Sequence, residues 1–204
     1  MFLKLVYTTL FLSLFSTTIL SADFSKGRVA YENGDFQSAL REWLPLAEGG
    51  NSKAQYALGW LYERKLLQYV AAIKWYTLAA KQGDANAQTH LCWLYDNGIG
   101  VPKNYKTAFK WCLQAAEQGY HLAQFNVGMF YDDGRGVSEN NSIAARWYLL
   151  AAEQGYANAQ GNLAVLYAFG DGVPKDYILA HMWGNIAAAN GNDRGAKLRE
   201  DFES

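Results

Sequence analysis

The sequence has 204 residues, a formal net charge of −1, seven Trp and fourteen Tyr. A chain this close to neutral lacks the basic surface that nucleic acid or an anionic membrane attracts, so we expect neither as a partner. Its length is sufficient for one elongated repeat domain, in which each repeat needs only a local core.

The first 22 residues have the composition of a secretory signal peptide. Lys4 precedes an uncharged run of 18 residues, from Leu5 to Ala22, of which seven are Ser or Thr. A spanning helix needs about 20 mostly apolar residues, whereas an early cation, a short apolar centre and small residues at Ser21 and Ala22 fit a cleavable signal. We therefore predict that residues 1–22 are removed and that the protein is exported, either periplasmic or secreted, with no stable membrane insertion. An uncleaved membrane anchor is the alternative.

Residues 23–50 predict an irregular leading helix pair, divided at Gly34-Asp35. Asp35 suits the N-cap of the second helix, because its carboxylate can accept from the free backbone N–H groups there. A first repeat is usually irregular because one of its faces meets water.

A pattern then recurs four times, first over 33 residues and afterwards every 36 residues, which indicates a helical solenoid. We predict an all-α superhelix of helix pairs, with repeats at 51–83, 84–119, 120–155 and 156–191. In each first helix, Ala-Gln is followed by an apolar, a small and an aromatic position. The small residue is Gly59, Cys92, Gly128 or Ala164. Because Gly within a helix costs roughly 0.5–1 kcal/mol relative to Ala, a small residue here indicates a close helix crossing.

Glycine pairs follow the later first helices, as at Gly98 and Gly100, and permit the positive φ of a chain reversal. No strand precedes them and no Lys-Ser/Thr follows, so we predict no nucleotide site and no cofactor. Asn104, Asn140 and Asp176 then stand as N-caps of the second helices.

Each second helix carries small-x-x-Trp-x-x-x-Ala, and these spacings place the residues on one helical face. We therefore predict that the tryptophans of this pattern are core residues: Trp75, Trp111, Trp147 and Trp183. A glycine at C′ should end each helix: Gly83, Gly119, Gly155 and Gly191.

Two segments depart from this regularity. The first full repeat lacks loop glycines between Glu63 and Gln68, so its turn should be tighter or partly helical. Residues 192–204 are predicted to form a C-terminal capping segment, in which Leu198 and Phe202 cover the last repeat.

These motifs resemble the Sel-1-like repeat family, relatives of the tetratricopeptide repeat. The resemblance extends over residues 50–191. It is carried by these segments: Leu58-Gly59-Trp60-Leu61-Tyr62, Gly172-Val173-Pro174-Lys175-Asp176, Phe109-Lys110-Trp111 and Ala115-Ala116-Glu117-Gln118-Gly119. It implies a right-handed α/α superhelix that acts as an adaptor or scaffold. Because the family has no shared active site, the resemblance transfers no catalytic residue.

Catalytic and metal-binding patterns are missing from the sequence. His90, His121 and His181 lie at unlike positions in different repeats, so we predict no metal site. No nucleophile signature occurs, and Asp132-Asp133 is more simply a solvated turn.

The two cysteines, Cys92 and Cys112, lie 20 residues apart in one repeat. Some exported relatives resemble one another in having a helix-to-helix disulfide in each repeat, with an eight-residue loop between cysteines, and this spacing departs from theirs. We expect the small position at Cys92 to face Ala108, which leaves Cys112 one turn away. A disulfide needs Cα atoms within about 7 Å, so we predict two buried thiols, with a bridge as the alternative.

We therefore predict a non-enzymatic binding module, monomeric, that holds a protein or peptide partner on its concave face. The alternatives are a secreted hydrolase that acts on a β-lactam or a cell-wall-derived substrate, and a purely structural envelope protein. In each first helix, the residue after the small position and the one four before it should form an outward stripe. The predicted partner-binding residues are Tyr56, Trp60, Thr89, Trp93, Phe125, Met129 and Val165, with Gly161 completing the stripe. Neighbouring first helices could instead cover this area.

Overall fold

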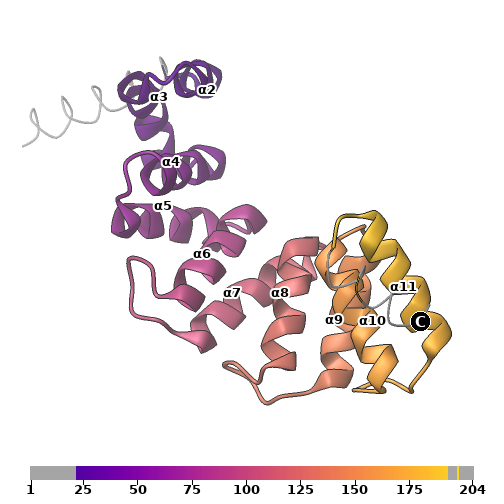
Figure 1. Ribbon diagram of the computed structural model, residues 1–204. Coiled ribbons are helices and arrows are strands. Elements are labelled where there is room, and N and C mark those ends of the chain that lie inside the picture. The colour runs from indigo at the N-terminus through magenta and orange to yellow at the C-terminus, as the bar shows by residue number, and fades with distance from the viewer. Residues whose placement is uncertain (1–21, 193–196, 198–204) are drawn as a thin grey trace, which may run out of the picture. The chain divides into compact units, whose positions relative to one another are not determined.

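The computed structural model describes residues 22–192 and residue 197. In these residues the fold is all-α, as predicted, and its helices pack in sequential pairs (Figure 1). The helices are α2 (Phe24–Glu32), α3 (Phe36–Glu48), α4 (Ser52–Arg64), α5 (Tyr69–Lys81), α6 (Ala85–Asn97), α7 (Tyr105–Glu117), α8 (His121–Asp132), α9 (Asn141–Glu153), α10 (Ala157–Phe169) and α11 (Tyr177–Ala189). The predicted signal-peptide cleavage near Ser21 and the predicted cap by Leu198 and Phe202 lie outside the described residues.

The chain divides into two compact units, Met1–Ala87 and Gln88–Ser204. In the first unit, α2 packs on α3, α3 on α4, and α4 on α5. In the second, each helix from α7 to α10 packs on the next one along the chain. Each unit is therefore held together by neighbouring helices in the manner of a solenoid.

Local capping chemistry sets the helix boundaries. The N-cap side chains of Asp35, Asn104, Asn140 and Asp176 each accept a hydrogen bond from backbone N–H groups in the first turn, which confirms these predictions. The predicted C′ glycines all have positive φ, between 82° and 92°. The turn of the first full repeat is tighter, as predicted, and it places Leu67 at a φ of 53° without a glycine.

The Ala-Gln motif connects helices through a repeated hydrogen-bond arrangement. The buried Gln124 side chain donates to the carbonyl oxygen of Ala116 at the end of α7, and its own carbonyl oxygen accepts from Gln154 at the end of α9. Gln160 makes the same pair of bonds with Ala152 and Asn190. Because an unpaired buried amide would be costly, the glutamine fixes how successive helix pairs meet.

The tryptophan prediction needs correction in three repeats. Trp75 is buried, with 7% of its surface exposed, but Trp111, Trp147 and Trp183 are only partly buried. The fully buried position is the next residue, which is Tyr76, Cys112 or Tyr148 in the first three repeats. The alanines of the pattern are fully buried, as predicted, so the face is kept and only its large buried side chain is the residue after the tryptophan.

Candidate binding surface

The first unit brings together the two predicted stripe residues Tyr56 and Trp60. They lie one turn apart on α4, with ring centroids 6.5 Å apart, and both are partly buried. Tyr56 also packs on Tyr76 of α5 at 5.8 Å. These contacts hold the two rings against the helix pair and leave part of each ring open to the surface.

Both rings line a cavity of about 390 Å³ that lies entirely within the first unit. Phe24 and Tyr31 of α2 and Trp43 of α3 form the rest of its aromatic wall. The indole N–H of Trp60 donates to the Tyr31 hydroxyl at 2.8 Å, and that of Trp43 donates to the Phe24 carbonyl oxygen at 3.1 Å. Because both indole donors have partners within the wall, the cavity presents mainly ring surfaces.

Charged side chains line the cavity beside the rings. Arg28 and Lys53 contribute two exposed cations, and Asp84 contributes a carboxylate. The Asp84 carboxylate also accepts the backbone N–H of Ala87 at 2.9 Å, so it caps the start of α6. The site thus combines an apolar centre with charged groups of both signs at its edge, a combination typical of ligand pockets.

The second unit holds the other predicted stripe residues, and they differ in accessibility. Trp93 on α6 is 43% exposed, whereas Thr89, one turn earlier, is buried at 9%. The remaining three are partly buried: Phe125, Met129 and Val165. Trp93 thus offers the largest open surface among them, and Thr89 can contribute little to a partner.

Phe125 packs inside the second unit, with its ring centroid 5.8 Å from that of Tyr148 and 5.0 Å from that of Tyr156. Gly161, which completed the predicted stripe, is buried. A Cβ at that position would lie 2.6 Å from the Asn192 side chain. Neighbouring groups therefore cover part of the predicted stripe.

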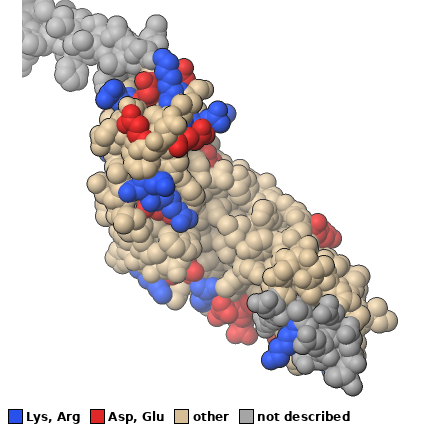
Figure 2. All heavy atoms as spheres, turned by 45° about the horizontal axis from the view of Figure 1, so that its top comes forward, with Lys and Arg blue, Asp and Glu red and all other residues tan. Residues whose placement is uncertain are grey.

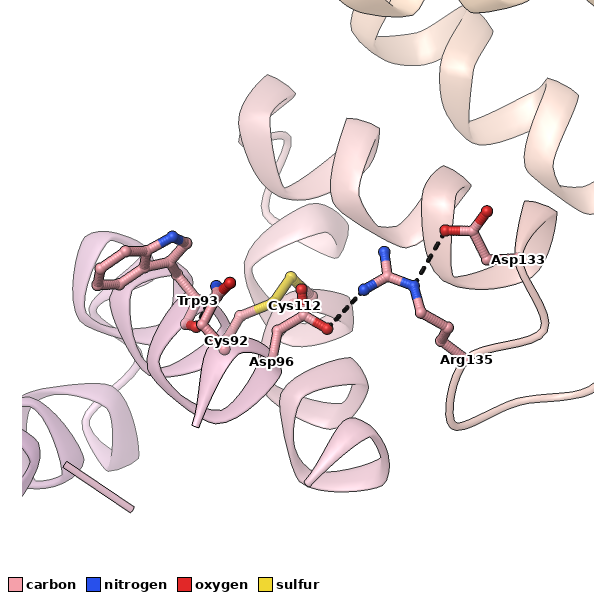
Figure 3. A network of polar contacts seen from close by, with 7 residues as sticks. Cys92, Trp93, Asp96, Cys112, Asp133 and Arg135 are labelled. Atoms are coloured by element: carbon pink, nitrogen blue, oxygen red, sulfur yellow. Dashed lines mark hydrogen bonds and ion pairs between the residues drawn. A yellow bond between two sulfur atoms is a disulfide. The ribbon is translucent and has the colours of Figure 1, made fainter. Parts of the chain in front are cut away.

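The cysteines form a disulfide, Cys92–Cys112, so the prediction of two free thiols is wrong (Figure 3). Their Cα atoms are 5.2 Å apart, because the small position of the first helix faces the residue after the tryptophan. The same geometry holds in the next repeat, where a Cβ at Gly128 would lie 2.5 Å from the Tyr148 ring. A disulfide of this kind is typical of proteins that fold in an oxidising compartment.

Two repeats hold glycine at the small position and tyrosine after the tryptophan. In both of them the phenol reaches a carboxylate four residues beyond the glycine. Tyr76 donates to Glu63 at 2.8 Å, and Tyr148 donates to Asp132 at 3.0 Å. Burial raises the pKa of both phenols, and the neighbouring carboxylates raise the pKa further. Both tyrosines therefore stay neutral as hydrogen-bond donors and are unsuited to act as bases at neutral pH.

In the disulfide repeat the equivalent carboxylate, Asp96, meets a cation. Arg135 Nη1 lies 2.7 Å from Asp96 Oδ1, and its Nε lies 3.0 Å from Asp133 Oδ2 (Figure 3). Burial lowers the pKa of Arg135, but the two carboxylates outweigh burial and raise it overall. Figure 3 shows Trp93 projecting away from this network, so its ring is free of the ion pairs.

The described residues provide no cluster of three or more His, Cys, Asp or Glu side chains that could hold a metal ion. None of the helices in residues 22–192 is long and apolar enough to cross a membrane. On the face shown in Figure 2, basic and acidic side chains are interspersed, and neither sign forms a continuous block.

Sequence reasoning missed the part of the cavity wall formed by Phe24, Tyr31 and Trp43. Phe24 and Tyr31 lie on α2, which does not carry the motif of the later first helices, so the register of the later repeats could not place them. Trp43, with Ala47, resembles the second-helix pattern, which indicates a core position and not a cavity wall. The aromatic residues concentrated in α2 and α3 were the available signal.

The profile of the Sel1 repeat matches residues 52–84, 85–120, 121–156 and 157–192. The chain is similar to the crystal structure of a Sel1 repeat protein from Oxalobacter formigenes, with 38% identity and a TM-score of 0.73 over 84% of this chain and 71% of that one. It is also similar to c5321, a protective antigen present in uropathogenic Escherichia coli strains. There the identity is 32% and the TM-score 0.77, over 82% of this chain but only 38% of that protein. Helicobacter pylori cysteine rich protein B shares the fold, with 20% identity and a TM-score of 0.52 over 64% of this chain and 95% of that one. No curated protein matches the sequence.

Proposed function

The chain belongs to the Sel1 repeat family, and we propose that it is a non-enzymatic interaction module that binds a segment of a partner protein. Sel1 repeats generally mediate protein binding. The observation that carries the proposal is the aromatic cavity of the first unit, at about 390 Å³. This volume falls within the range of about 300–1,000 Å³ that is typical of ligand sites.

The chemistry of the cavity wall favours an apolar or aromatic anchor side chain. Trp60 and Tyr56 offer ring surfaces, and aromatic residues dominate binding hot spots. Arg28 and Lys53 lie beside the rings, so an acidic residue next to the anchor would strengthen binding. In the second unit, Trp93 offers a further exposed ring for contact with a partner.

We propose that the protein acts in the bacterial envelope or in the secreted fraction. The Cys92–Cys112 disulfide supports an oxidising compartment, and the run from Leu5 to Ala22 has the composition of a signal peptide. N-terminal sequencing of the exported protein tests this. A mature chain that begins near Asp23 is expected, and one that still begins at Met1 would contradict cleavage.

Peptide selection tests the binding function whatever the identity of the partner. A phage-displayed library of random peptides is panned on the purified protein, and we expect the selected sequences to share an aromatic or large apolar anchor. Binding of the selected peptides should weaken at least ten-fold for Trp60→Ala. Lys53→Glu should weaken the binding of those peptides that carry an acidic residue next to the anchor. Phe169→Ala is the control, because Phe169 is 72% exposed and lies outside the cavity.

The hydrolase alternative is tested in parallel with a chromogenic β-lactam. We expect no turnover above that of a heat-denatured sample. Turnover that persists in a carefully purified protein would replace the binding proposal with an enzymatic one.

A further inference from the structure

A second cavity, of about 270 Å³, lies in the second unit between α9, α10 and the loop that follows α10. Ala145 and Leu149 of α9 form one side of it, and Leu163 and Tyr167 of α10 form the other. Val173 of the loop completes the apolar wall. This cavity shares no lining residue with the aromatic cavity of the first unit, so it is a separate candidate site.

The preceding repeat holds an aromatic ring at the position where this cavity lies open. Ala145 follows Phe109 by one repeat of 36 residues, and Tyr167 follows Tyr131 by the same interval. The Phe109 ring packs edge-on against Tyr131, with ring centroids 5.5 Å apart and an interplanar angle of 90°. Ala145 ends at Cβ and lines the cavity, so the place of that ring beside Tyr167 is left open. The cavity therefore corresponds to the place of one aromatic side chain.

The size and the chemistry of the wall also suit a single aromatic side chain. A volume of about 270 Å³ is just below the range of roughly 300–1,000 Å³ that is typical of sites for drug-sized ligands. Leu163 and Val173 offer apolar contacts. The Tyr167 ring can receive an incoming ring edge to face, as Tyr131 receives Phe109. We therefore expect a phenyl group as the apolar part of the ligand.

Arg146 places a positive charge at this cavity. It lines the cavity and is exposed, and none of the described side chains forms an ion pair with it. The Ser142 hydroxyl, which also lines the cavity, already donates to the Gly172 carbonyl oxygen at 2.6 Å. A planar guanidinium can bind a carboxylate through two parallel hydrogen bonds. Charge complementarity therefore favours a ligand that carries a carboxylate next to its ring.

We propose that this cavity binds the C-terminal phenylalanine of a partner protein, with the phenyl ring in the place that Ala145 leaves open and the terminal carboxylate on Arg146. A C-terminal phenylalanine carries both groups on one residue, which matches a cavity for one side chain with a cation beside it. This site lies within the second unit and is independent of the aromatic cavity, so either site can bind without the other.

N-acetylphenylalanine is the probe, because it has the ring and the carboxylate of a C-terminal residue and little else. Its titration is followed by the backbone amide shifts of the isotope-labelled protein. These shifts separate Leu163 and Val173 at this cavity from Tyr56 and Trp60 at the aromatic cavity. A single residue binds weakly, so we expect a Kd on the order of 1 mM at this cavity. N-acetylphenylalaninamide, which lacks the carboxylate, should bind about five-fold more weakly.

Two variants and a matched control test the two parts of the site. Ala145→Phe restores the ring of the preceding repeat, so it should fill the cavity and abolish binding there. Arg146→Gln should weaken binding of the acid about five-fold and leave that of the amide unchanged. Lys110→Gln on α7 is the control, because it removes the equivalent cation beside a position that Phe109 already fills. It should leave both affinities unchanged.

Several results would overturn the proposal. One is the absence of saturable shifts at Leu163 and Val173 with about 20 mM probe, whether or not Tyr56 and Trp60 respond. Another is wild-type affinity in a folded Ala145→Phe variant. Equal affinities of the wild type for the acid and the amide would rule out the terminal carboxylate as the recognised group. If Ala145→Phe does not fold, Arg146→Gln decides, and an equal loss for the acid and the amide would contradict the proposal.

Discussion

The repeats at 84–119 and 120–155 join their two helices at the same crossing point, but by different chemistry. In the first, Cys92 and Cys112 join the two helices covalently. In the second, Gly128 lets the Tyr148 ring lie against the helix backbone, and the phenol donates to Asp132. The two pairs occupy equivalent positions, 20 residues apart in both repeats.

Three positions therefore determine how the two helices meet at the crossing point. Between these two repeats the small residue and the residue after the tryptophan change together, whereas the carboxylate four residues beyond the small one is Asp in both. Where a disulfide replaces the tyrosine, the carboxylate Asp96 pairs with Arg135. A substitution at one of these positions should therefore be judged by what the other two hold.

The largest loss of stability is expected when Tyr148 is removed from the repeat at 120–155. Tyr148 is fully buried, so Tyr148→Ala should lower the free energy of unfolding by ~3–5 kcal/mol through the cavity it leaves. Urea denaturation followed by circular dichroism measures this. Tyr148→Phe keeps the ring and removes the hydroxyl with its hydrogen bonds to Asp132 and Asn162, so it should cost ~1–3 kcal/mol. Equal losses for both variants would show that the ring contributes nothing.

Breaking the disulfide should have the next largest effect. Cys92→Ala with Cys112→Ala should cost ~3 kcal/mol, the value for a bridge that closes a loop of this length. Reduction of the wild-type protein should shift its urea midpoint in the same direction, and reductant should not affect the double variant.

Replacing the disulfide with a glycine–tyrosine pair tests whether the two pairs are equivalent. Cys92→Gly with Cys112→Tyr reproduces the neighbouring repeat, and Asp96 already stands where the new phenol needs an acceptor. We expect this variant to recover at least half of the stability lost in the double alanine variant. No recovery would mean that the two pairs are not equivalent.

A smaller loss of stability should appear at alkaline pH. The pKa values of Tyr76 and Tyr148 are raised in the folded state above the ordinary value of 10.0. The unfolded chain loses these protons above pH 10 while the folded chain keeps them, so their contribution is complete below pH 10 and falls as the pH rises. By pH 11 the loss should be ~1 kcal/mol for each tyrosine. Urea midpoints between pH 8 and pH 11 should fall less steeply for Tyr76→Phe with Tyr148→Phe, and identical slopes would contradict this assignment.

The smallest effect is expected at Arg135. Its ion pair with Asp96 is partly exposed, with 26% and 23% of the two side chains accessible, so Arg135→Ala should cost only ~1 kcal/mol. In the background of Cys92→Gly with Cys112→Tyr, the cost should be smaller, because the phenol then shares Asp96. Chemical denaturation of the four proteins gives the coupling as a double-mutant cycle.

Much of the fold could be predicted because its signals are local. Asn104 and Asp176 cap helices through backbone groups three or fewer residues away, and Gly119 ends a helix within one turn. These short-range rules act whatever the helix packs against. The helix pairs and the all-α class follow from the same periodicity.

The disulfide could not be predicted in the same way, because it depends on the rotation of one helix against another. A shift of one residue moved the buried position from Trp111 to Cys112 and brought Cys112 opposite Cys92. The signal was present in the sequence, since Gly59 with Tyr76 and Gly128 with Tyr148 pair small and large residues at the same positions.

The candidate site was only partly predictable for a related reason. Tyr56 and Trp60 follow the repeat pattern, and both line the cavity. Phe24 and Tyr31, which also line the cavity, come from α2 of the irregular leading pair. Such terminal repeats adapt to their own surroundings, so the register of later repeats does not locate their side chains.

Calorimetric titration of a selected peptide into the wild-type protein and the Trp60→Ala variant tests the binding function most directly. We expect saturable binding to the wild type, at least ten-fold weaker binding to Trp60→Ala, and unchanged binding to Phe169→Ala. The circular dichroism melts of all three proteins should remain cooperative. Equal affinity of a folded Trp60→Ala variant and the wild type would contradict a partner site in the aromatic cavity.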